Sequence, residues 1–194
     1  RAAVPAAAVS LSWLPNAICV ARILLVAPVA IALVEGHYAL TLGLFAVAAV
    51  SDGLDGWLAK TFGWTSELGK ILDPIADKLL LVTAFVTLSV LGLAPVWLMA
   101  AAVLRDVVIA GGATAYRLRF GRLDGGPTPI SKLNTLLQLS FVLAVIADAA
   151  WLRVPDPLVM LLGATTFVTT VVSGIDYVLT WSRKARRAAR AAAA

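Results

Sequence analysis

The chain has 194 residues, of which 61% are hydrophobic and 14% charged, and its mean hydropathy is +0.93. Soluble globular domains average roughly 45–50% apolar and about 25% charged residues, so this composition excludes an ordinary soluble fold. A single cysteine excludes a disulfide scaffold. The formal net charge of +5 is more typical of loops facing anionic lipid than of a nucleic-acid surface in so apolar a chain. We therefore predict an integral membrane protein that binds no nucleic acid.

Six apolar stretches are each long enough to cross a bilayer as a helix, which takes about 20 residues. In chain order they run roughly over residues 15–34, 38–59, 73–91, 96–116, 132–150 and 157–181. The connections alternate in charge: those near 35–37, 92–95 and 153–157 carry only Arg153 as a basic residue, whereas the others are rich in Lys and Arg. This asymmetry predicts an all-α membrane protein with six transmembrane helices and both termini cytoplasmic. Residues 1–194 are predicted to form one transmembrane domain, with a short juxtamembrane segment at 1–14 and a basic tail at 182–194.

Five of the 11 acidic residues, four of them aspartates, lie between positions 52 and 77, at the connection of the second and third stretches. Asp52 and Asp55 are three apart and Asp73 and Asp77 are four apart, so each pair shares one face of a helix. The short connection lets the two helices lie side by side, which brings the four carboxylates together at the cytoplasmic rim. Carboxylates that close stay ionised only when cations compensate them. Hard oxygen ligands favour Mg²⁺, Mn²⁺ or Ca²⁺, and a pair of such ions suits phosphoryl chemistry.

A purely structural role would explain single members of this set of four aspartates. Asp73 followed by Pro74 is also typical of a helix N-cap with Pro in the first turn. That explanation does not account for four aspartates on matching faces.

The pattern D-x₂-D-G-x₂-A-K-x₈-G-x₃-D-x₃-D over residues 52–77 resembles the signature of the CDP-alcohol phosphotransferase family at every spacing. Lys60 stands where the family has Arg, which keeps the charge but loses a bidentate grip on phosphate. The opening segment 15–22 resembles the P-N-x-x-T-x-x-R start of the phosphatidylglycerol and cardiolipin branch, with Cys19 in place of Thr. The segment 130–138 resembles the I-S-K-x-N-T-x-x-Q stretch of eukaryotic-type cardiolipin synthases.

The resemblance implies transfer of the phosphatidyl group from CDP-diacylglycerol to phosphatidylglycerol, with release of CMP. It implies two divalent cations, Mg²⁺ or Mn²⁺, held by Asp52, Asp55, Asp73 and Asp77, with Asp77 also acting as the general base. It further implies a homodimer in a bacterial inner membrane, or a mitochondrial inner membrane if the source is eukaryotic, with the active site on the cytoplasmic side. The residues expected to line the CDP-diacylglycerol pocket are Asn16, Cys19, Gly56, Lys60, Ser66 and Gly69.

Arg105 is a costly cation within the fourth apolar stretch. Neutralisation by Asp106 is one explanation, but adjacent residues on a helix point about 100° apart and are expected to pair poorly. We therefore predict an anion site for the acceptor phosphate made by Arg105 and Lys132. Ser131 and Asn134 either assist this site or cap the fifth helix.

Two other functions remain open from the sequence. Phosphatidylglycerophosphate synthesis, with glycerol-3-phosphate as the acceptor, differs only in the acceptor site. A divalent-cation transporter would also use acidic residues, but transporter sites usually lie near the midplane at a repeat interface. Metal flux into liposomes, measured beside CMP release, separates transport from transfer.

Overall fold

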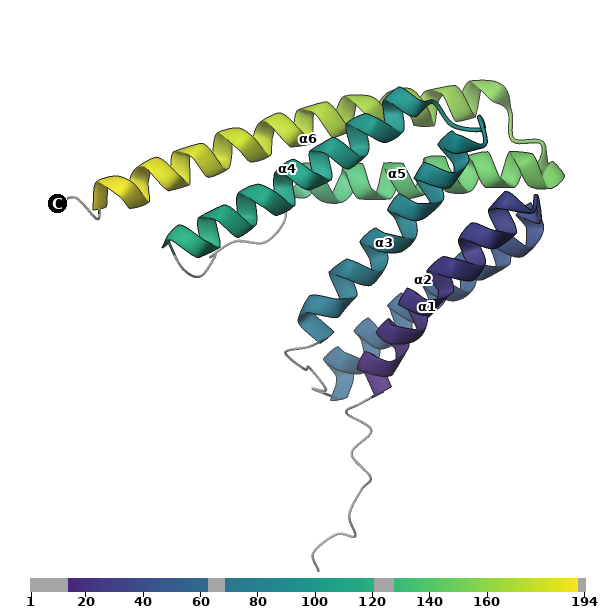
Figure 1. The fold of residues 1–194 in the computed structure, drawn as a ribbon, viewed down its shortest axis with the longest axis horizontal. Coiled ribbons are helices and arrows are strands. Elements are labelled where there is room, and N and C mark those ends of the chain that lie inside the picture. The colour runs from purple at the N-terminus through teal and green to yellow at the C-terminus, as the bar shows by residue number, and fades with distance from the viewer. Residues whose placement is uncertain (1–13, 63–68, 121–127, 192–194) are drawn as a thin grey trace, which may run out of the picture. The chain divides into compact units, whose positions relative to one another are not determined.

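The structure, a computed structural model, describes residues 14–62, 69–120 and 128–191 (Figure 1). Every element in these ranges is a helix, so the all-α class is confirmed for the described residues. The helices are α1 (Leu14–Val34), α2 (Tyr38–Phe62), α3 (Gly69–Val90), α4 (Val96–Phe120), α5 (Pro129–Ala147) and α6 (Asp156–Ala191), with a π-helical turn η2 (Asp148–Leu152) after α5. One helix occupies each of the six predicted stretches. α6 continues to Ala191, so most of the predicted basic tail is helical.

Four helices in the described ranges are long and apolar enough to cross a membrane. The candidate spans are 17–34 in α1, 96–119 in α4, 129–152 in α5 with η2, and 156–184 in α6. Among its described residues, α2 contributes a shorter apolar segment, Tyr38–Ser51. The composition of the helices therefore supports an integral membrane protein. The count of six spans and the cytoplasmic placement of the termini stay predictions.

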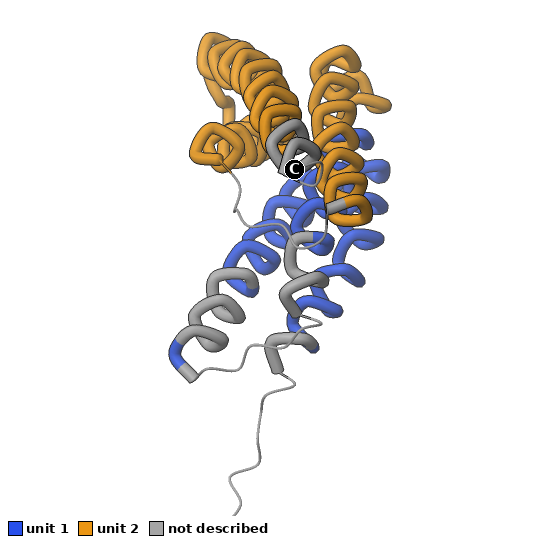
Figure 2. The backbone as a smooth tube through the Cα atoms, turned by 90° about the vertical axis from the view of Figure 1, so that its left-hand side faces the viewer, with its two compact units in different colours: residues 1–87 blue, residues 88–194 orange. Residues whose placement is uncertain are grey.

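The chain divides into two compact units, residues 1–87 and 88–194 (Figure 2). The prediction of one domain over 1–194 stays a prediction. In the first unit α1 packs along α2 (Figure 1), and the buried residues include Val29 and Leu33 of α1 and Phe45 of α2. Gly36 ends α1 with φ +76°, and the next amide donates back to the Ala32 carbonyl at 2.8 Å. This left-handed cap turns the chain directly into α2.

In the second unit α6 packs against both α4 and α5. Gly163 of α6 permits the close approach of α5, since a Cβ there would lie 3.2 Å from the Phe141 ring. Trp97 of α4 and Phe167 of α6 form an edge-to-face pair with ring centroids 5.1 Å apart. These contacts fix which residues of the three helices lie at the same level, and they place Arg105 of α4 beside the start of α5.

Candidate active site

The acidic motif lies on helices as the spacing predicts. Asp52 and Asp55 belong to α2, and Asp73 and Asp77 belong to the first turns of α3. α2 ends and α3 begins on either side of residues 63–68. The helical backbone supports the expected pairing of carboxylates on each helix.

Most side chains of the predicted donor and metal site lie outside the described part of the structure. This holds for Ser66 as a whole, and for the side chains of Asn16, Asp52, Asp55, Lys60 and Asp73. Gly56 and Gly69 are positions of helical backbone. The convergence of these residues on one pocket stays a prediction.

Asp77 is the one acid of the motif whose side chain is described. Its Oδ1 accepts a hydrogen bond from Arg22 Nη1 of α1 at 2.5 Å. The Arg22 side chain is 1% exposed and the Asp77 side chain 51% exposed. A guanidinium buried in an apolar helix requires a compensating anion, and Asp77 provides it while keeping half of its surface accessible. The ion pair therefore fixes Asp77 against α1.

Arg22 was not predicted as a site residue, although its charge in an apolar helix is a signal that the sequence shows. Arg22 is a charged residue in the first apolar stretch, and such residues in membrane helices usually pair within the protein. Cys19, predicted to bind the donor, is buried three residues earlier on α1. The two residues therefore share one side of the helix.

Arg105 joins the three helices of the second unit. Its Nε donates to Ser173 Oγ of α6 at 2.8 Å, and its Nη2 donates to Ser131 Oγ of α5 at 2.6 Å. Its Nη1 donates to Asp106 Oδ1 at 2.9 Å, so the expectation that these neighbours pair poorly was wrong. The long, flexible arginine side chain brings the guanidinium to the carboxylate although the two residues leave the helix in different directions. Arg105 is 7% exposed.

The three other predicted acceptor residues differ in their contacts and in their burial. Ser131 contacts Arg105, whereas Lys132 is exposed at the start of α5. Asn134 is fully buried, and its Oδ1 accepts from Thr169 Oγ1 at 2.9 Å and Thr170 Oγ1 at 2.8 Å. Asn134 thus joins α5 to α6 rather than to the guanidinium.

The N-terminus of α5 is capped by another residue. Thr128 is the N-cap, and its Oγ1 accepts from the Ser131 amide at 3.4 Å. Pro129 follows in the first turn, a position where its missing N–H costs nothing. The side chains of Ser131 and Asn134 are therefore not the caps, and the Ser131 hydroxyl accepts from Arg105.

Comparisons with known proteins agree with the motif. The family described as CDP-alcohol phosphatidyltransferase matches residues 12–181. The chain is 30% identical over 182 residues to a probable cardiolipin synthase (CMP-forming) of Drosophila melanogaster, which covers 86% of this chain and 56% of that protein. It is 31% identical over 180 residues to the cardiolipin synthase (CMP-forming) of Homo sapiens, covering 84% of this chain and 60% of that protein.

A probable phosphatidylglycerophosphate synthase of Mycobacterium tuberculosis is 37% identical over 139 residues, covering 70% of this chain and 62% of that protein. The chain thus spans little more than half the length of these three relatives. The names of these relatives include both products considered from the sequence, cardiolipin and phosphatidylglycerophosphate.

Proposed function

Because the chain belongs to the CDP-alcohol phosphatidyltransferase family, we propose that it makes cardiolipin and CMP from CDP-diacylglycerol and phosphatidylglycerol. The match to the family over residues 12–181 carries this proposal, and the spacing of the motif within it supplies the chemistry. Similarity over more than four-fifths of the chain to two proteins named cardiolipin synthase supports phosphatidylglycerol as the acceptor.

The donor set fits a pair of hard divalent cations. Its members are four carboxylates at helical spacing on α2 and α3, and oxygen ligands of this kind suit Mg²⁺ and Mn²⁺. Within the described residues no group of three potential ligands occurs, since only Asp77 of the four has a described side chain. When bound, the ions neutralise the diphosphate of the donor and stabilise the leaving CMP. The residues proposed to hold them are Asp52, Asp55, Asp73 and Asp77.

Asp77 is proposed to act as the general base as well. A hydroxyl of the acceptor glycerol attacks the phosphorus that carries the diacylglycerol. The new P–O bond forms as the bond to CMP breaks, and the hydroxyl proton passes to Asp77. A base must lie about 2.6–3.2 Å from that hydroxyl. Arg22 supports this role because its hydrogen bond to Oδ1 holds the carboxylate in one orientation while half of it stays exposed.

The donor nucleotide is proposed to lie between α1 and the motif. Lys60 offers a single point charge to a phosphate where the family has a bidentate Arg. Gly56 and Gly69 have no side chain and allow a phosphate to approach the backbone. Asn16, Cys19 and Ser66 complete the proposed pocket.

The acceptor phosphate is proposed to bind at Arg105, whose guanidinium contacts Ser131, with Lys132 and Asn134 of the same helix as further members of the proposed site. A guanidinium has five N–H donors, and the contacts of Arg105 with Ser173, Asp106 and Ser131 use three. Asp106 pairs with Arg105, so these two side chains together with Lys132 carry a formal net charge of +1. That charge complements the single negative charge of a phosphodiester better than the nearly doubly charged phosphomonoester of glycerol-3-phosphate.

The basic residues of the connections support an active site on the cytoplasmic side with both termini cytoplasmic. We place the protein in a bacterial inner membrane, or in the mitochondrial inner membrane if the source is eukaryotic. A homodimer is part of the proposal on family resemblance alone.

Phosphatidylglycerophosphate synthesis is the second candidate, favoured by the 37% identity to the mycobacterial relative. The purified chain in mixed micelles should release CMP from CDP-diacylglycerol when phosphatidylglycerol is added, and cardiolipin should appear in equal amount. CMP release that depends on glycerol-3-phosphate and ignores phosphatidylglycerol would transfer the proposal to the second candidate.

A further inference from the structure

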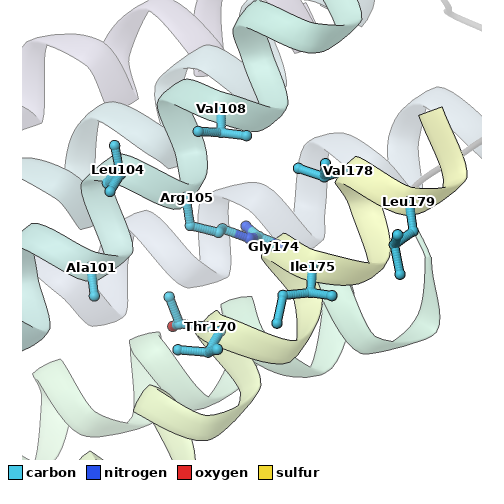
Figure 3. A pocket seen from close by; sticks show the side chains of 10 residues that line it. Ala101, Leu104, Arg105, Val108, Thr170, Gly174, Ile175, Val178 and Leu179 are labelled. Atoms are coloured by element: carbon cyan, nitrogen blue, oxygen red, sulfur yellow. The ribbon is translucent and has the colours of Figure 1, made fainter. Parts of the chain in front are cut away.

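An apolar groove runs between α4 and α6 in the second unit (Figure 3). It encloses about 410 Å³, within the range of about 300–1,000 Å³ typical of pockets that hold an organic ligand. Its walls are large aliphatic side chains, among them Leu104 and Val108 of α4 and Ile175 and Leu179 of α6. All four are exposed along the opening. The groove is therefore suited to a hydrocarbon chain.

Two polar residues line the groove, and neither offers it a free hydroxyl or amide. Thr170 donates its hydroxyl to Asn134 Oδ1. Arg105 contributes its alkyl stem, whose Cγ would lie 3.6 Å from a Cβ at Gly174. Gly174 has no side chain, and both residues line the groove at that point. A polar ligand would find no partner on these walls, whereas an acyl chain needs none.

Arg105 connects this groove to the proposed acceptor site. Its stem lies in the groove, while its guanidinium extends to Ser131 at the start of α5 and to Ser173 of α6. It is the one charged residue among those that line the groove. A ligand that combines an anionic phosphate with a long apolar chain matches both ends of this side chain.

We infer that the groove between α4 and α6 binds an acyl chain of the acceptor phospholipid, whose phosphodiester lies at the Arg105 guanidinium. This inference rests on the proposed function and names its acceptor as a membrane lipid of one negative charge. The large residues along the rim disfavour a second copy of the chain as occupant, because close helix contacts in membranes use small residues. Lipid tails are as apolar as the groove, so the groove alone does not select one lipid. Selectivity for the acceptor comes from the contact of its phosphate with Arg105, and the bound acyl chain positions the acceptor.

Two matched pairs of variants test the groove. Val171→Trp fills it from α6 and Val108→Trp fills it from α4, because both residues line it. Val172→Trp and Val107→Trp are the controls, since these neighbours are 44% and 61% exposed and lie outside the lining. The controls carry the same bulk at the same depth of the same helix.

Native mass spectrometry of the full chain with phosphatidylglycerol and no donor measures binding without turnover. Steady-state kinetics then give KM for each substrate with the other saturating. We expect each filling variant to lose bound phosphatidylglycerol and to raise its KM about tenfold with the KM for CDP-diacylglycerol unchanged. The controls should behave as the wild type.

Equal behaviour of filling variants and controls would overturn the inference. A raised KM for CDP-diacylglycerol would assign the groove to the donor, and a changed oligomeric state would assign it to a second copy, so either result overturns it too. Failure of the proposed function is a separate result: the wild type would then make no cardiolipin, while the binding measurement would still report whether the groove takes phosphatidylglycerol.

Discussion

Arg22 and Asp77 form an ion pair between α1 and α3 within the candidate site. The guanidinium is buried in α1 and the carboxylate is half-exposed at the start of α3. Removing either partner has a different consequence. Loss of Asp77 removes a carboxylate from a buried cation, whereas loss of Arg22 removes a hydrogen bond that orients an accessible carboxylate.

Replacing Arg22 tests whether this residue orients the Asp77 carboxylate or only stabilises the fold. Arg22→Gln should lower kcat about 10²-fold with little change in either KM, because a misplaced reactive group affects the transition state more than binding. Arg22→Lys should restore part of the rate, since an ammonium also holds the carboxylate. The kinetics are measured on the folded, monodisperse fraction. A wild-type kcat for Arg22→Gln would contradict the positioning role.

Asp77→Asn removes the proposed base while keeping the size of the side chain. Turnover should fall about 10²–10⁴-fold, because the amide accepts no proton, whereas CDP-diacylglycerol binding should change little. Asp156→Asn, at the start of α6 and outside the proposed site, is the matched control and should leave turnover unchanged. Near-native turnover of Asp77→Asn would require another base.

At the scale of the helices, the sequence located each element and missed several ends. The structure begins α5 at Pro129 rather than 132 because Thr128 caps it, although Lys132 suggested a boundary. α4 and α6 continue beyond the predicted spans to Phe120 and Ala191. Hydropathy predicts where a helix leaves the membrane. The helix continues past that point when the polar residues that follow favour the helical conformation.

The sequence did not predict which residues of neighbouring helices lie at the same level. Arg105 meets Ser131 and Ser173 across 26 and 68 residues, and Arg22 meets Asp77 across 55. Helical periodicity gives the face of a side chain but not the level at which a distant helix passes it. The grouping of Arg105 with Ser131 was predictable because both are polar residues in an apolar region. The Asp106 contact was mispredicted because the argument ignored side-chain length.

The polar contact between α5 and α6 makes a prediction for stability. Asn134→Leu removes the acceptor of Thr169 and Thr170, and should lower the free energy of unfolding in detergent by about 1–2 kcal/mol. Ser140→Ala on the same helix removes only a bond to its own backbone at Leu136, and should change stability little. Denaturant titration followed by helical circular dichroism measures both variants. Equal stability of Asn134→Leu and the wild type would contradict the contribution of this contact.

For the whole molecule, four aspartates on two helices imply that activity depends on divalent ions. CMP release should stop in excess EDTA, because without the metal ions neither the diphosphate charge nor the charge of the four carboxylates is compensated. It should return on addition of Mg²⁺ or Mn²⁺. The assay is run on the purified chain in mixed micelles, with the helical content checked before and after chelation. Full turnover in EDTA with the helices intact would exclude the metal-dependent mechanism.

The identity of the acceptor is the central claim, and a competition between acceptors tests it most directly. The purified chain receives CDP-diacylglycerol with phosphatidylglycerol and glycerol-3-phosphate both at saturation, and mass spectrometry identifies the lipid products. The ion pair of Arg105 with Asp106 and the adjoining apolar groove favour a lipid acceptor. The account predicts cardiolipin as the main product. Phosphatidylglycerophosphate formed without cardiolipin would contradict it.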